Sequence, residues 1–228
     1  MNPDILAAAM WYIVFVISTT CHEAAHAWTA SHYGDDTARR QGLVTLNPIP
    51  HIQYAPIGML LVPLAALALS GGRTLLGWGM APYSPEWAYR YPKRAALMAL
   101  AGPAANLLLA VVSGLVLREG LAKGWFMPAG GMLPIGGMLP GWQSMVASLL
   151  VIMLLLNSIL FVLNLVPIPP FDGGAVVMLF LPEHWARGYQ RQLHDPNAQM
   201  IGQLVVFWLF AREVAPRVAD FALGCVFA

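Results

Sequence analysis

Two histidines, His22 and His26, lie four residues apart, and this spacing is the clearest indication of a catalytic site in the chain. On a helix, positions i and i+4 lie on one face, so both imidazoles can bind a single metal ion. Glu23 directly follows the first histidine and can reach a water on the outer side of that ion. Zinc held by few protein ligands keeps a position for water and lowers its pKa towards neutrality. The pattern favours a metal-dependent hydrolase, for which we expect one zinc ion (Zn²⁺) per chain.

The composition places the chain in a lipid environment. Of its 228 residues, 58% are hydrophobic and only 10% are charged, and the mean hydropathy is +0.64. Soluble domains carry about 25% charged residues, so this chain cannot cover a water-facing surface of ordinary size. The net charge of +1 gives no reason to expect nucleic acid as a partner. We therefore predict an integral, multi-pass membrane protein whose surroundings are the lipid bilayer.

Five apolar segments predict an all-α polytopic fold with about five transmembrane segments, within a range of four to six. They cover approximately residues 5–30, 55–70, 95–117, 142–166 and 198–228. We expect a single domain over residues 1–228, with a core at 5–181 and a C-terminal apolar segment at 198–228. A short β-strand is expected at residues 43–46. The Lys and Arg residues divide evenly between the two sides of a five-span arrangement, which leaves the orientation open.

A metal site needs a third protein ligand, and Asp172 is the candidate among six aspartates. It follows an apolar segment and lies between a proline-rich stretch and two glycines, a sequence that cannot remain regular helix. Unwound backbone at membrane depth survives only where protein buries it or where it lines a watery cavity. An ionisable residue in that position is a functional candidate. The alternative is an exposed aspartate in an interfacial turn.

Asn164, Asn106 and His51 are further polar residues whose roles can be predicted. Asn164, at the end of the fourth segment, could stabilise an oxyanion or hold an extended substrate backbone, because its amide both donates and accepts. The alternative is a hydrogen bond between packed helices. For Asn106 we expect such a packing role. The remaining histidines lack partners at ligand spacing, although Asn47-Pro48 could fold His51 back towards the first segment.

Taken together, these motifs resemble the site-2 protease family of intramembrane zinc metalloproteases, in its compact form without PDZ or CBS domains. The similarity extends over roughly residues 5–174 and rests on the motifs at residues 22–26, 45–48, 101–106 and 164–174. The resemblance implies that zinc is held by His22, His26 and Asp172. It also implies that Glu23 is the catalytic base and later proton donor, and that Asn164 assists near the scissile carbonyl. The strand-like stretch at residues 43–46 is then expected to pair with unwound substrate.

The resemblance implies an intramembrane zinc metalloprotease that hydrolyses peptide bonds within or near transmembrane segments, as in regulated intramembrane proteolysis. Its partner would be a membrane-protein substrate with a transmembrane helix, and its location the bacterial cytoplasmic (inner) membrane. The sequence does not determine the oligomeric state.

Two other functions stay open. The first is a metal-ion transporter or channel, because intramembrane ionisable residues often mark an ion pathway. Its two halves would be expected to share a hydropathy pattern, and none is evident. The second is a catalytically inert binder of membrane proteins, against which the intact Glu23 and Asp172 argue.

Overall fold

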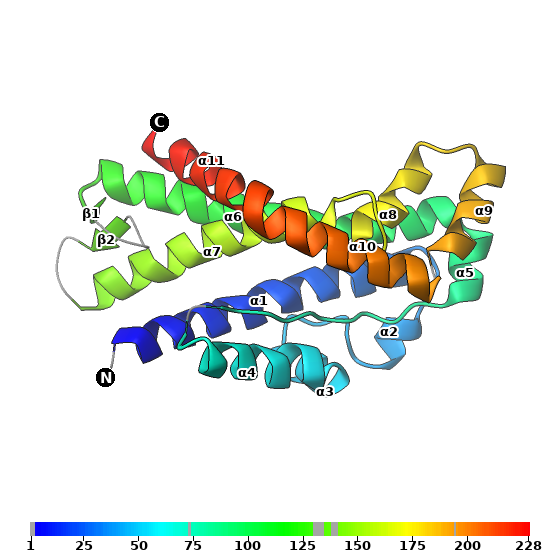
Figure 1. The fold of residues 1–228 in the computed structure, drawn as a ribbon, viewed down its shortest axis with the longest axis horizontal. Helices are drawn as coiled ribbons and strands as arrows, with labels where there is room; N and C mark the ends of the chain where they lie inside the picture. Colours follow the sequence, from blue (N-terminus) through cyan, green and yellow to red (C-terminus); the bar gives the residue numbers. More distant parts are fainter. Residues whose placement is uncertain (1–2, 73, 130–134, 138–140, 194) are drawn as a thin grey trace.

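The computed structural model describes residues 3–72, 74–129, 135–137, 141–193 and 195–228 (Figure 1). Three long helices, α1 (Pro3–His32), α6 (Pro92–Ala122) and α7 (Trp142–Asn164), lie side by side along its length. Helix α6 packs against both α1 and α7, and its buried face carries small residues such as Ala95, Ala99 and Gly102. Small side chains let helix backbones approach closely in a membrane, where lipid provides no hydrophobic force between helices. The protein is an all-α polytopic membrane protein, as predicted.

The described residues hold three helices that are long and apolar enough to cross a membrane, or four if one bent pair counts as a span. The bent pair combines α3 (Pro48–Tyr54) with the helix at Ile57–Leu69, which comprises a π-helical turn, η1 (Ile57–Leu61), and α4 (Val62–Leu69). The bend is 111° and falls where Pro56 follows Ala55, because proline disfavours helical backbone in the preceding residue. The bent pair covers the second of the five predicted segments, residues 55–70, so that segment is a broken or re-entrant one.

The predicted fifth segment is helical but interrupted. It comprises α10 (Pro196–Leu209), the π-helical turn η3 (Phe210–Val214) and α11 (Ala215–Phe227). Arg212 and Glu213 lie in the π-helical turn, and Arg217 follows one turn later, all three exposed. It is not among the three apolar helices of spanning length. The pieces α10 and α11 have 14 and 13 residues, each shorter than a span, and the charged residues at the break between them are costly in hydrocarbon.

The only strands in the described part of the chain are β1 (Phe126–Pro128) and β2 (Ile135–Gly137). They form an antiparallel pair between α6 and α7, with Phe126 opposite Gly137. The strand predicted at residues 43–46 is wrong, because a turn at residues 41–42 follows α2 (Thr37–Arg40) and residues 44–46 form bends. Leu43 is fully buried against Ala27 and Ala38, so core packing and not a strand partner holds this stretch.

The chain does leave regular helix before Asp172, as predicted. Helix α7 ends at Asn164, turns and bends follow, and α8 (Asp172–Val176) leads through a 3₁₀ turn, η2 (Val177–Leu179), to α9 (Glu183–Gln192). Lys93, at the start of α6, holds this region by donating from Nζ to the carbonyls of Leu179 and Leu181 at 2.7 and 2.6 Å. Helix α10 closes over the other side, where Gly202 lies directly against Pro169. Asp172 is therefore held on a segment fixed from two sides.

Candidate metal centre

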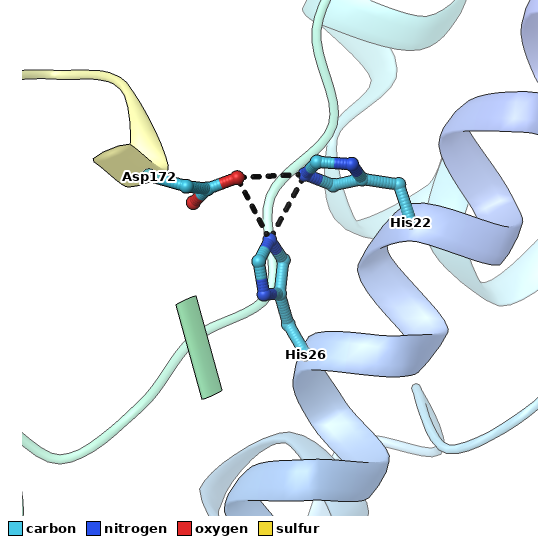
Figure 2. A group of neighbouring side chains, drawn as sticks. All are labelled: His22, His26 and Asp172. Carbon is cyan, nitrogen blue, oxygen red and sulfur yellow. Dashed lines mark hydrogen bonds and ion pairs between the residues drawn. The ribbon is translucent and has the colours of Figure 1, made fainter. Parts of the chain in front are cut away.

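Three side chains from two distant parts of the chain converge at one point (Figure 2). Helix α1 carries His22 and His26, and α8 carries Asp172 at its first residue. The two histidine Nε2 atoms are 2.9 Å apart, and Asp172 Oδ2 lies 3.1 Å from that of His22 and 3.4 Å from that of His26. Both histidines are buried, with 7% of their surface exposed. The structure thus brings together all three residues predicted as ligands.

Hydrogen bonds on the far side of each ring determine where its proton lies. His22 Nδ1 is 2.6 Å from Asn106 Oδ1, and His26 Nδ1 is 2.8 Å from the backbone carbonyl of Met98. Both partners are oxygens that only accept, so each Nδ1–H donates, and each Nε2 of a neutral imidazole carries a lone pair. Two nitrogen lone pairs and a carboxylate oxygen therefore face one another.

This donor set fits a zinc ion. Electron pairs in contact repel unless a cation lies among them, and Asp172 Oδ2 is buried without a hydrogen-bond donor. Two imidazole nitrogens and a carboxylate oxygen are the ligands of many catalytic zinc sites.

Gly102 of α6 keeps the space beside the donor atoms open. A Cβ atom at this position would lie closer to the Nε2 atoms of His22 and His26 than van der Waals contact permits. The glycine of the sequence Ala101-Gly102-Pro103 therefore serves the candidate metal site as well as helix packing.

Glu23 is also buried, with 7% of its surface exposed. The backbone of the irregular segment at residues 74–84 passes close to its carboxylate. A Cβ atom on Gly79 would clash with Glu23 Cγ and Oε1, so only glycine lets the backbone pass so closely. The segment is fixed at one end by Asp35, which accepts from the Ser84 amide at 2.8 Å. Trp78 donates its amide to the Gly58 carbonyl at 3.1 Å. Glycines on both sides of Trp78 are a sequence signal for such a close backbone approach.

The other polar candidates lie in different settings. Asn164 is the last residue of α7 and makes no side-chain hydrogen bond within the described residues, so its predicted role stays a prediction. Asn106 does bond to a second helix through Asn157, as a packing residue would, but it also contacts His22. His51 is buried and donates from Nε2 to the Thr45 carbonyl at 2.9 Å, and it is not part of the metal group. Asn157, in the middle of an apolar helix, was missed although polar residues there are often functional.

Residues 10–210 match Peptidase family M50. The chain belongs to this family. Membership in M50 confirms the resemblance to the site-2 proteases that the motifs indicated, and together with the apolar helices it identifies an integral membrane protein of a protease family.

Relatives of this M50 chain are similar over most of its length. It is 34% identical over 171 residues to "Putative zinc metalloprotease YwhC" of Bacillus subtilis, a match that covers 75% of this chain and 68% of the relative. It is 32% identical over 180 residues to "Putative zinc metalloprotease Rip2" of Mycolicibacterium smegmatis, with 78% of this chain and 59% of the relative covered. The protein of the same name from Mycobacterium tuberculosis is 28% identical over 214 residues, or 93% of this chain and 70% of the relative. No solved structure matches the chain.

Proposed function

We propose that this chain is an intramembrane zinc metalloendopeptidase that holds one zinc ion and cuts membrane proteins within or near their transmembrane segments. The observation that carries the proposal is the buried convergence of His22 Nε2, His26 Nε2 and Asp172 Oδ2, with Glu23 next to the first of them. Membership in a peptidase family and the names of the relatives support both the hydrolytic activity and the metal.

The proposed chemistry divides between the metal and the chain. A zinc ion held by His22, His26 and Asp172 supplies Lewis acidity and lowers the pKa of water towards neutrality. Glu23 takes a proton from the attacking water and later delivers it to the leaving amine. Gly79 permits this role by letting the backbone of segment 74–84 pass without displacing the carboxylate. The side-chain amide of Asn164 is proposed to hold the scissile carbonyl.

The proposed substrate class follows from the cost of unwinding a helix in lipid. Each backbone group freed from a helix costs several kcal/mol without water, so substrates should carry Gly, Pro or Asn near the cut. Within the described chain, residues 75–82 make one hydrogen bond between backbone groups, from Trp78. The unpaired backbone near Glu23 offers unwound substrate a pairing edge, which we propose in place of residues 43–46.

The bacterial relatives support a location in the bacterial cytoplasmic membrane, and the charge distribution supports a defined orientation there. One end of the molecule holds α2, α5 (Pro85–Arg90) and α9, and the other holds the β1–β2 pair (Figure 1). Lys and Arg residues collect at the first end, where they are Arg39, Arg40, Arg90, Lys93, Arg94, Arg187 and Arg191. The β1–β2 end has Arg118 and Lys123 at the close of α6. Because basic residues favour the cytoplasmic side, we propose that α2, α5 and α9 face the cytoplasm.

A pair of single-span peptides tests the proposed function. The zinc-loaded chain is reconstituted in phosphatidylcholine liposomes with two fluorogenic peptides, one with a Gly-Pro step at mid-span and one with an all-leucine span. We expect cleavage of the Gly-Pro peptide, much slower cleavage of the leucine peptide, and none after the metal is chelated. Both peptides left intact by a chain that carries zinc ions across the bilayer would contradict the proposal and favour a transporter.

A further inference from the structure

Three buried polar side chains, Ser18, Asn106 and Asn157, form a hydrogen-bonded series that joins the three long helices behind His22. Asn106 of α6 lies 2.6 Å from His22 Nδ1, and its Nδ2 donates to Asn157 Oδ1 of α7 at 2.8 Å. Asn157 Nδ2 donates in turn to Ser18 Oγ at 2.8 Å, which returns the series to α1 one turn before His22. Ser18, Asn106 and Asn157 are completely buried, with 0% of their surface exposed.

The backbone of Met153 fixes the direction of these hydrogen bonds. Asn157 Nδ2 also donates to the Met153 carbonyl at 2.8 Å, and a carbonyl can only accept. Both amide hydrogens of Asn157 are thereby used, and its oxygen must face a donor on Asn106. Asn106 consequently presents its nitrogen to Asn157 and its oxygen to His22.

This direction determines the state of the candidate metal ligand. A neutral imidazole carries one ring proton, and an oxygen at Nδ1 holds that proton there, which leaves the Nε2 lone pair for a metal. An Asn106 amide turned over would present N–H to Nδ1, favour the proton on Nε2 and remove the lone pair from the site. It would also bring the oxygens of Asn106 and Asn157 together, two buried acceptors without a proton between them.

We propose that Asn106 and Asn157 are positioning residues of the metal site. Asn106 sets the tautomer and ring orientation of His22, and Asn157 sets the orientation of the Asn106 amide. This inference rests on the proposed zinc-dependent function. It extends the site to α7, whose Asn157 acts through Asn106.

The test is the zinc affinity of the detergent-purified full chain, measured by competition with a chromogenic chelator. Asn157→Leu removes the acceptor that orients Asn106 and is expected to weaken zinc binding by about 10–100-fold, as loss of outer partners of ligands commonly does. Asn106→Asp supplies only acceptor oxygens, which hold the His22 proton at Nδ1 without help from Asn157. Adding Asn106→Asp to Asn157→Leu is therefore expected to restore much of the lost affinity.

Ser113→Ala serves as the matched control on α6. Ser113 is buried, with 3% exposed, and its hydroxyl donates to the Leu109 carbonyl at 2.7 Å, away from the series. Its loss is expected to leave zinc affinity unchanged. Thermal unfolding of each zinc-free variant separates the two roles, since a merely structural Asn157 would lower stability without rescue of zinc binding by Asn106→Asp.

Wild-type zinc affinity in Asn157→Leu, or a double variant that binds no better than Asn157→Leu, would overturn the proposal. If Asn157→Leu does not fold, Asn106→Asp and Asn106→Leu decide instead, and the proposal requires the first to bind zinc about tenfold or more tightly than the second. A wild-type chain that binds no zinc would have a different meaning, because it would contradict the proposed function and remove the basis of this inference.

Discussion

Glu23→Gln is expected to abolish peptide hydrolysis while leaving zinc binding intact. Glutamine has the shape of glutamate but cannot take a proton from water, and positioned acid–base groups contribute about 10²–10⁴-fold to rate. Glu23 is not one of the three converging ligand residues, so the zinc content should stay at the wild-type value. The measurement pairs the cleavage rate of the Gly-Pro single-span peptide with zinc content determined on the same preparation.

Glu119→Gln is the control for that substitution. Glu119 is exposed near the end of α6, where it pairs with Lys123 at 3.0 Å, and its loss should affect neither readout. Turnover retained in Glu23→Gln would contradict the assignment of the base. Loss of zinc from Glu23→Gln would instead place Glu23 among the metal ligands.

Gly102→Ala is expected to eliminate zinc binding even though alanine favours helices. A single Cβ atom at this position would meet the Nε2 atoms of both histidines, in the space that a shared metal requires. Replacing glycine by alanine within a helix is otherwise worth roughly 0.5–1 kcal/mol of stabilisation, so we expect the zinc-free variant to remain folded. Zinc content by mass spectrometry and helicity by circular dichroism report the two effects separately.

Gly114→Ala is the matched control on the same helix. A Cβ atom on Gly114 would make ordinary contacts, at 3.5 Å to Leu154 and 3.8 Å to Val226, so this variant should bind zinc normally. Stoichiometric zinc in Gly102→Ala would show that the two histidines do not share a metal in the arrangement of Figure 2.

The three candidate ligands could be predicted because each depends on local sequence. The spacing of His22 and His26 places them on one helix face whatever surrounds that helix. Asp172 was identifiable because prolines and glycines around it exclude a regular helix, and α7 does end at Asn164. The long apolar helices follow in the same way from the length of each hydrophobic segment.

The features that the sequence did not predict depend on contacts between distant segments. Residues 43–46 have strand-like composition, but a strand needs a partner, and Leu43 packs into the core instead. The closeness of Gly79 to Glu23 joins positions far apart in the chain. Asn157 contacts Asn106 only because α6 and α7 pack in one register. No pattern within a single segment encodes these three arrangements.

The zinc content of the detergent-purified wild-type chain, compared with that of Asp172→Ala, tests the three-ligand metal site most directly. We predict about one zinc per wild-type chain, as expected for a mononuclear catalytic site, and a sharp reduction in the variant. Stoichiometric zinc in Asp172→Ala would show that the third ligand lies elsewhere. A folded wild-type chain without zinc would contradict the metal site itself and favour the inert binder or the ion pathway.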